Sequence, residues 1–216
     1  MSTLAQLEAR LAARLVDAAN AVFSTTTLDE ALRTALSDYT AAAPLTMETV
    51  LTLPGTGREI ALNTLSGLIG VTDVWWPYAS TAETWPPNRV RGYRVWWDDA
   101  QPVLFIEAHV GAQPQAGDEL RLWYTRAHTV ENLDGGALTT LPSHHESALV
   151  TGAAGYAALS ENLDQIGALH LDTTETDALR QWGSARLAEF HRFLAAVRAA
   201  APAPGPAFGA GWELEA

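Results

Sequence analysis

Cysteine and lysine are both missing from this chain of 216 residues, and each absence excludes or disfavours particular kinds of site. Without cysteine, neither disulfide bonds nor thiolate metal sites can form. Without lysine, all 13 basic residues are arginine; they face 25 acidic residues, and the formal net charge is −12. Proteins that hold nucleic acid neutralise phosphates with clustered cations, so this acidic chain is not expected to grip DNA or RNA. Its charge either serves solubility or keeps passing DNA away from a wall.

Long apolar runs are also missing, and none would cross a bilayer. The first ten residues are amphipathic and charged, unlike a signal peptide. We therefore expect no membrane association. A hydrophobic content of 48% and a charged content of 18% are typical of globular proteins, and the length fits one core with appendages or two small lobes.

Recognisable catalytic motifs are missing too. There is no Gly-x-Ser-x-Gly elbow and no phosphate-binding glycine loop. The possible metal ligands are His144, His145 and Glu146, with His109 and His128 as further candidates. Adjacent histidines point to different sides of a helix, however, and Glu146 is explained as part of a helix cap. We expect no enzymatic activity, no bound metal and no cofactor.

Two amphipathic helices are predicted at the start of the chain. Leucines at helical spacing indicate the first, over residues 3–22. The second opens at a Thr27-x-x-Glu30 capping box and runs to about Ala43, where Pro44 ends it.

From Thr46 to about Val130 the apolar period changes to two, which is typical of strands. The turn at 54–57 predicts that the first two strands form a hairpin, and Pro77 is expected to end the third. The predicted strands are residues 49–53, 58–62, 71–76, 89–97, 103–107 and 119–126. Short strands at this spacing indicate an antiparallel β-sandwich or a small barrel.

A helix poor in charge follows, opened by a Ser143-x-x-Glu146 capping box and extending to about residue 160. Gly152 and Gly155 lie inside it, and each costs about 1 kcal/mol relative to alanine in a helix interior. We expect close approach of another helix, that at 28–42, to compensate. A polar link at about 161–173 then leads to a long helix from Thr174 to about Ala200.

Tryptophan is concentrated in the predicted β-region, at positions 75, 76, 85, 96, 97 and 123. Neighbouring residues on a strand point to opposite faces, so the two members of an adjacent pair cannot share one core. The surplus is expected either to stack on a sugar or to fill contacts between subunits, where tryptophan is enriched. The alternative is a β-domain covered on both faces. The predicted inter-subunit residues are Trp75, Trp76, Trp85, Trp96 and Trp97.

Residues 201–216 are rich in proline and glycine and are predicted to form an extended arm. The arm ends with Phe208, Trp212 and Leu214. Apolar anchors on such a segment indicate docking on another surface, such as a neighbouring subunit; a frayed tail without function is the alternative.

The order of elements is a helix at 28–42, a β-insertion at about 47–130 and a helix at 143–159. Within this order stand five characteristic segments: 31–39 followed by Pro44, 74–77, 117–128, 139–142 and 150–157. Over residues 28–160 the chain resembles the head–tail adaptor (connector, head-completion) proteins of tailed bacteriophages, in the variant whose helical bundle carries an inserted β-domain.

The resemblance implies an α+β fold, namely a helical bundle with an inserted antiparallel β-sandwich or small barrel of about six strands. The N-terminal bundle helices would occupy 1–46, the β-domain 47–130, the C-terminal helices 131–200 and the arm 201–216.

The resemblance also implies a ring, usually of twelve copies, beneath the portal at the capsid vertex. The ring would extend the DNA channel, which DNA traverses without specific binding, and would join the capsid to the tail. The implied partners are the portal protein, neighbouring copies and a tail or stopper protein. The protein would be made in the host cytoplasm and reside in the neck of the virion. Phe208, Trp212 and Leu214 would then dock on the portal or on a neighbouring protomer.

A rival interpretation is a carbohydrate- or receptor-binding β-module of a phage or cell-surface protein, with its tryptophans exposed for stacking.

Overall fold

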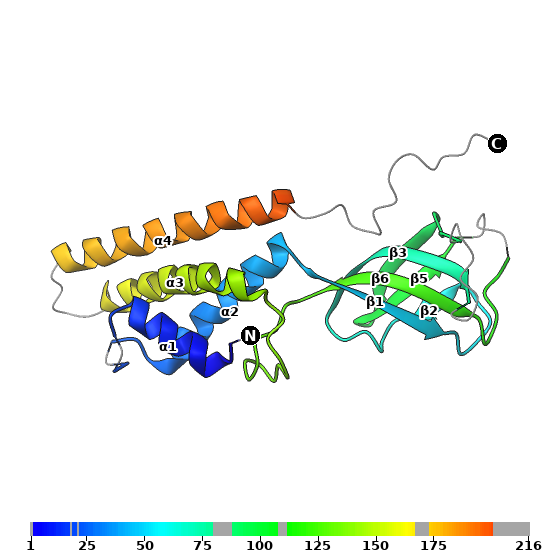
Figure 1. The fold of residues 1–216 in the computed structure, drawn as a ribbon, viewed down its shortest axis with the longest axis horizontal. Coiled ribbons are helices and arrows are strands. Elements are labelled where there is room, and N and C mark those ends of the chain that lie inside the picture. The colour runs from blue at the N-terminus through cyan, green and yellow to red at the C-terminus, as the bar shows by residue number, and fades with distance from the viewer. Residues whose placement is uncertain are drawn as a thin grey trace. The chain divides into compact units, whose positions relative to one another are not determined.

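A computed structural model describes residues 2–17, 19–20, 22–79, 88–107, 112–166 and 173–200 (Figure 1). The helices within these ranges are α1 (Leu4–Arg14), α2 (Thr25–Ala42), α3 (Glu146–Ile166) and α4 (Thr173–Ala200), and a short 3-10 turn, η2 (Ser143–His145), precedes α3. The strands are β1 (Leu45–Thr52), β2 (Glu59–Ala61), β3 (Leu68–Tyr78), β4 (Tyr93–Asp98), β5 (Gln101–Ile106) and β6 (Glu119–Arg126). The predicted α+β class is confirmed.

The elements fall into two compact units, one of which interrupts the other in the sequence. The helical unit combines the residues up to Pro44 with those from His128 through α4. The β unit begins at Leu45 and continues to Ala127. All six strands therefore lie between α2 and α3 in the chain.

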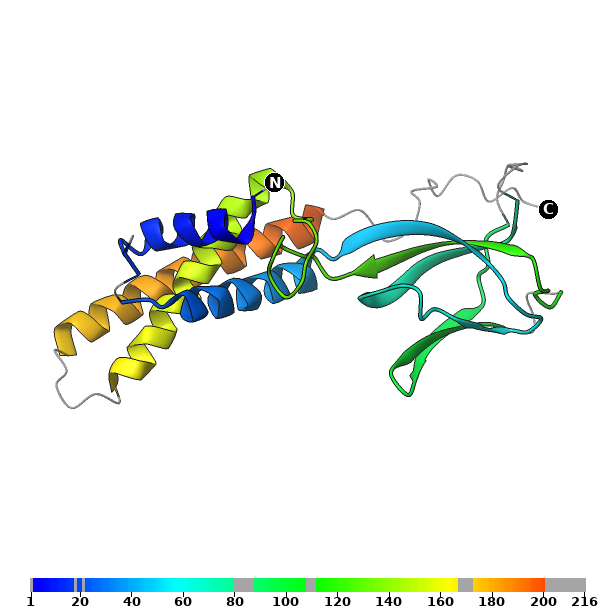
Figure 2. The ribbon, with the colours of Figure 1, turned by 90° about the horizontal axis from the view of Figure 1, so that it is seen from below.

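The helical unit has one apolar core, to which all four helices contribute. Apolar residues three or four positions apart bring one side of each helix to this core. α3 contacts each of the other three helices (Figures 1 and 2). Fully buried core side chains include Leu7 and Leu11 of α1, Leu28 and Leu32 of α2, Leu149 of α3 and Phe190 of α4.

α1 ends at Arg14, well before the predicted end at residue 22, and the physical cause lies in the next residues. Val16 has a φ of 58°, which an α-helix cannot contain. The buried carboxylate of Asp17 then accepts hydrogen bonds from the backbone N–H groups of Val22 (2.9 Å) and Phe23 (2.8 Å). These bonds hold a turn where the prediction placed the last helical turn.

α2 begins one turn earlier than the Thr27 capping box predicts. Ser24 is the N-cap, and its hydroxyl accepts a hydrogen bond from the Thr27 N–H at 3.1 Å. The predicted stop at Pro44 is confirmed, because the helix ends at Ala42.

The prediction of close helix packing at Gly152 and Gly155 is confirmed, but the predicted partner is wrong. Both glycines face α4 rather than α2: Gly152 lies against Phe190, and Gly155 lies against Leu187 and the backbone of Gly183. A second glycine on the facing helix lets the two backbones approach, which the sequence of α3 alone does not reveal.

The six strands form two antiparallel sheets of three, with orders β1-β6-β3 and β2-β5-β4. β1 pairs with β6 along its whole length, from Leu45 opposite Arg126 to Thr52 opposite Glu119. β2 pairs instead with β5. The predicted hairpin between residues 49–53 and 58–62 is therefore wrong, because its two strands lie in different sheets.

The fourth and fifth strands, β4 and β5, are joined by a tight hairpin. Asp98 is paired with Gln101, and the two residues between them, Asp99 and Ala100, have φ values of 43° and 65°. Positive φ at both central residues is the signature of a type I′ turn, whose twist matches that of the flanking strands.

Two strand boundaries differ from the prediction. β3 continues through Pro77 to Tyr78 instead of ending before the proline. Pro77 lies within a break in the pairing with β6, between Trp75 and Tyr78, and proline is tolerated at such an irregularity because no ladder donor is needed there. β4 begins at Tyr93 rather than at residue 89.

One apolar core of the β unit draws on both sheets. Along β6 every second residue is buried, namely Leu120, Leu122 and Tyr124, as the period of two predicts. From the other sheet, Leu104 and Ile106 of β5 are fully buried.

Candidate interaction surface

Among the described residues of the β unit, the exposed tryptophans are on β4. Trp96 is 37% exposed and Trp97 is 51% exposed. Because they are adjacent on a strand, they point to opposite faces. Trp97 is on the same side as Tyr93 and Val95, which pack against the core of the β unit, whereas Trp96 is on the outer face of the sheet.

Trp96 is part of a small polar-aromatic hollow on that outer face. Its ring lies 5.8 Å from the ring of Phe105 on β5. Beside the two rings, Arg94 Nε donates to the Glu107 carboxylate at 2.8 Å, and the Arg94 side chain is 76% exposed. These four residues line a hollow of about 480 Å³. An exposed aromatic pair flanked by a cation and an anion can bind an apolar side chain, a sugar ring or an acidic peptide.

The other predicted contact residues on β3 are already covered within the chain. Trp75 is 8% exposed and Trp76 is 6% exposed. Trp76 belongs to the core, and its indole N–H donates to Asp118 Oδ2 at 3.2 Å. The opposite face of the same strand carries Trp75, so burial of both rings requires that both faces be covered.

The cover over Trp75 is a layer of aromatic rings around one arginine. Trp75 lies 4.5 Å from the ring of Trp123, and the guanidinium of Arg121 lies 5.0–5.3 Å from the ring centroids of Trp75, Tyr78 and Trp123. Glu48 pairs with Arg121 at 2.6 Å. Cation–π contacts of this kind stabilise the layer and leave the Trp75 face little free surface.

A buried carboxylate, Asp73, holds the edge of this layer. It accepts hydrogen bonds from Trp75 Nε1 at 3.0 Å and from Arg89 Nε at 2.7 Å. Sequence reasoning did not single out this aspartate; its position two residues before a tryptophan pair was the only local signal.

Trp85 and the arm residues Phe208, Trp212 and Leu214 lie outside the described residues, as does His109. Their predicted roles stay predictions.

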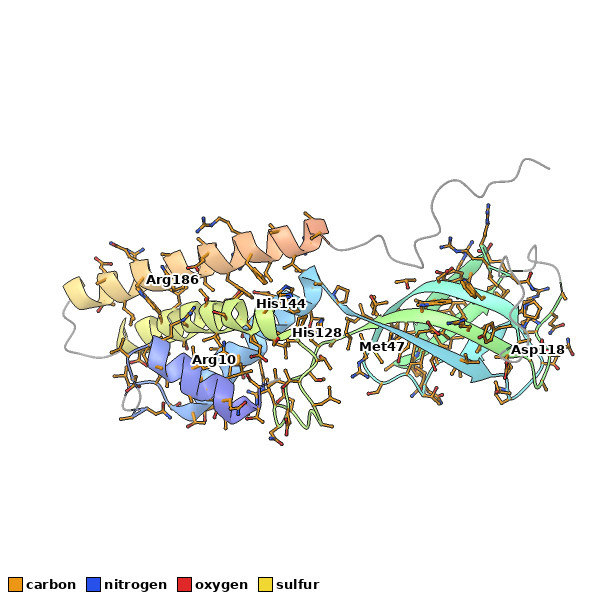
Figure 3. All side chains as sticks on the ribbon, in the orientation of Figure 1. Arg10, Met47, Asp118, His128, His144 and Arg186 are labelled. Atoms are coloured by element: carbon orange, nitrogen blue, oxygen red, sulfur yellow. The ribbon has the colours of Figure 1, made fainter. Side chains whose placement is uncertain are left out.

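His128 and His145 both contact Tyr39 in the helical unit, and His144 lies beside His145 (Figure 3 labels His128 and His144). Tyr39 Oη is 2.6 Å from His145 Nδ1, and its ring also contacts that of His128. His128 Nε2 is 3.0 Å from the Ala43 carbonyl oxygen. Burial, with a smaller contribution from neighbouring His144, lowers the pKa of His145, and burial raises the pKa of Tyr39. No cluster of three or more possible metal ligands occurs in the described part of the chain.

Glu146 does not cap a helix, contrary to the prediction from Ser143-x-x-Glu146. Pro142 is the N-cap of η2 and makes no side-chain cap bond. Glu146 is instead 4% exposed and accepts hydrogen bonds from Ser2 N–H (2.9 Å), Ser2 Oγ (2.7 Å) and Arg10 NH1 (2.8 Å) (Figure 3 labels Arg10 on α1). Burial alone would raise the pKa of Glu146, but these bonds outweigh it and lower the pKa. The local motif could not reveal partners that lie more than 130 residues earlier, in and before α1.

No family model matches the sequence, and a search of curated proteins finds no match. Among solved structures, one similar chain comes from the neck of an empty GTA particle computed with C6 symmetry. It is 18% identical, the match covers 81% of this chain and 87% of that chain, and the TM-score is 0.30. A TM-score of this size carries no argument about fold or function. No described helix combines the length and apolarity needed to span a membrane.

Proposed function

We propose that this chain is a structural virion protein, a head–tail adaptor that forms a ring beneath the portal and joins the capsid to the tail. The observation that carries the proposal is the order of the two units. In the described part of the chain, a β unit of six strands interrupts a unit of four helices, and the helices on both sides of the interruption share one core. This is the organisation implied by the resemblance of residues 28–160 to adaptor proteins with an inserted β-domain. The shared core of the two sheets supports a small β-sandwich as that domain.

The charge of the chain supports a channel through which DNA slides. With a net charge of −12 and no lysine, the protein offers DNA little cationic surface. Like charges keep phosphates away from a wall, which favours passage over binding. The proposed role is structural rather than catalytic, and it needs neither metal nor cofactor.

The exposed tryptophans support contacts between protein subunits. Trp96 and Trp97 are large apolar side chains that are partly exposed to solvent on one strand. Tryptophan is enriched at the centres of protein interfaces. The proposed partners are the portal protein, neighbouring copies in a ring of about twelve as the resemblance implies, and a tail or stopper protein. The proposed location is the virion neck, after synthesis in the host cytoplasm.

Electron microscopy of capsids that carry a portal but lack this protein tests the proposal. Purified protein is added, and the portal vertex is reconstructed with and without it. We expect an added ring of density with cyclic symmetry beneath the portal. A vertex that stays unchanged at saturating protein would contradict the adaptor role.

One observation favours a second candidate, a carbohydrate-binding β-module. The hollow formed by Arg94, Trp96, Phe105 and Glu107 combines a stacking ring with charged hydrogen-bonding groups. A glycan array would show binding that Trp96→Ala abolishes if this candidate is correct. Absence of binding to any glycan, together with ring formation at the portal, would exclude it.

A further inference from the structure

β4 presents an edge to which another strand can be added. Among the described strands it is the last of the sheet β2-β5-β4, so its outward N–H and C=O groups lie on the side away from β5. Exposed edges of this kind are templates for strand addition. β4 has no proline, lysine or bulge that would blunt the edge, because its sequence is Tyr-Arg-Val-Trp-Trp-Asp and its pairing with β5 is regular.

The side chains of β4 alternate in a pattern that a partner strand would have to complement. Tyr93, Val95 and Trp97 share the inner face, and the exposed fraction is largest at Trp97. Arg94 and Trp96 share the outer face. Arg94 uses Nε for Glu107 and has further guanidinium N–H groups that can donate to a second carboxylate.

Residues 212–216 of this chain have the complementary pattern. Their sequence is Trp-Glu-Leu-Glu-Ala, in which apolar residues alternate with acidic ones. The alternation has the period of a strand, and the segment lacks proline. It follows a proline- and glycine-rich stretch that begins after α4 ends at Ala200, which would act as a tether.

We propose that residues 212–216 of a second copy add to β4 as an antiparallel strand. The register places Trp212 opposite Trp97, Leu214 opposite Val95 and Ala216 opposite Tyr93 on the inner face. On the outer face, Glu213 lies opposite Trp96 and Glu215 opposite Arg94. Directly opposed residues of an antiparallel pair share a face, so the largest apolar residue meets the most exposed tryptophan, and an acid meets the arginine.

Two observations select this arrangement. A parallel strand would still place an acid, Glu213, opposite Arg94, but it would put Ala216, the smallest of the five residues, opposite Trp97 and leave that ring without an apolar partner. Trp96 and Trp97 are exposed in the single chain, and tryptophan exposed in this way is typical of contacts between subunits, which favours a second copy as the source of the strand. The inference concerns self-association, and it holds or fails independently of the head–tail role.

Disulfide trapping in the full-length protein tests the register, and the absence of native cysteine makes the background clean. One copy carries Arg94→Cys and a second, of different tag mass, carries Glu215→Cys. Opposed Cβ atoms of an antiparallel pair lie about 4.5–5.5 Å apart, close enough to form a disulfide with a small adjustment. We expect a mixed dimer on oxidation, and we expect Trp212→Ala in the Glu215→Cys copy to reduce its yield several-fold.

The matched control replaces Leu214 instead of Glu215, since that side chain would lie on the opposite face from Arg94. Leu214→Cys should cross-link to Arg94→Cys several-fold more slowly, and equal rates would overturn the register. A chain carrying both Arg94→Cys and Glu215→Cys that oxidises to a cross-linked monomer would overturn the assignment to a second copy. Failure of every pair to cross-link at high concentration, in variants with unchanged circular dichroism, would overturn strand addition itself.

Discussion

Gly152 of α3 lies directly against the ring of Phe190 of α4. A Cβ atom built on Gly152 would be 2.4 Å from Phe190 Cδ1, far inside van der Waals contact. Phe190 is fully buried in the helical core, so its ring has little room to move aside. The absence of a side chain at position 152 is therefore what sets the distance between α3 and α4 at this point.

Gly152→Ala should destabilise the protein although alanine favours helices. Overpacking a well-packed core costs about 1–3 kcal/mol, which exceeds the gain of about 1 kcal/mol in helix propensity. Urea denaturation measures the change. Gly55→Ala is the matched control, because a Cβ there meets no atom within 4 Å, and it should leave the midpoint nearly unchanged. Phe190→Leu combined with Gly152→Ala should cost less than the sum of the two single changes; strict additivity would argue against the contact.

Glu146→Gln should lower the free energy of unfolding at pH 7 by about 1–3 kcal/mol. It replaces a buried carboxylate, which accepts three hydrogen bonds, by a neutral amide that cannot accept all three equally well. The pKa of Glu146 is lowered in the folded protein, so its contribution is present above the unfolded pKa near 4.5 and is lost as the pH falls further. The difference between wild type and variant should consequently shrink in acid, as thermal melts at pH 7 and pH 3 would show.

The exposed Glu30 provides the control for Glu146. Its pair with Arg33 is open to solvent, with the Glu30 side chain 70% exposed, so Glu30→Gln should change stability by no more than about 0.5 kcal/mol. If Glu146→Gln changes stability by no more than this, the hydrogen bonds from Ser2 and Arg10 to Glu146 contribute little to the stability of the fold.

Glu8 should give the opposite pH dependence. Burial first, and then the hydrogen bond and charge of Asp29 on α2, raise the pKa of Glu8 to about 7. The folded protein thus holds a proton that the unfolded chain releases near pH 4.5, so this contribution to stability is lost as the pH rises through about 7. Glu8→Gln should be more stable than wild type at pH 8, by about 1–2 kcal/mol once solvent screening is allowed for, and similar to it at pH 4. If the stability difference between Glu8→Gln and wild type is the same in melts at pH 4 and pH 8, Glu8 does not hold this additional proton in the folded protein.

Deletion of residues 203–216 tests the predicted arm. The sequence of the arm predicts no packed structure of its own, so the melting temperature should stay nearly unchanged. Joining of the truncated protein to portal-bearing particles should be lost, as measured by co-sedimentation. Truncated protein that joins particles as well as the full chain would make the arm a passive tail, whereas truncation that unfolds the protein would show that the arm packs on its own chain.

Local sequence patterns predicted many elements but not their partners. β6 was predicted at its observed bounds, Glu119–Arg126, because alternation along a strand with one buried face is a property of that strand alone. The pairing of β1 with β6 joins residues that are far apart in the chain, from Thr52 with Glu119 to Leu45 with Arg126. The turn at 54–57 therefore did not indicate the true partner of β1. The same limit explains why Gly152 and Gly155 pointed to close packing without revealing α4.

The tryptophan pairs show why the candidate surface could be predicted only in part. Two adjacent residues on a strand must point to opposite faces of the sheet. This alternation does not determine whether either face is exposed to solvent. At Trp75 and Trp76 both faces are covered, one by the core and one by Trp123 and Arg121, which matches the alternative of a doubly covered strand. At Trp96 and Trp97 the cover is incomplete. Which pair is exposed depends on the position of each strand in its sheet, and that position is set by long-range pairing.

The two ends of the β unit are neighbours: Leu45 is paired with Arg126. The last residues of the helical unit before the β unit also lie beside the first residue after it. His128 Nε2 lies 3.0 Å from the Ala43 carbonyl oxygen, and the His128 N–H donates to Thr40 Oγ1 at 3.2 Å. A gene could therefore gain, lose or exchange the whole intervening segment at a single site without rerouting a helix. The strands carry the exposed tryptophans while the helices carry the glycine-packed core, so lineages could change what the protein binds and inherit its scaffold intact.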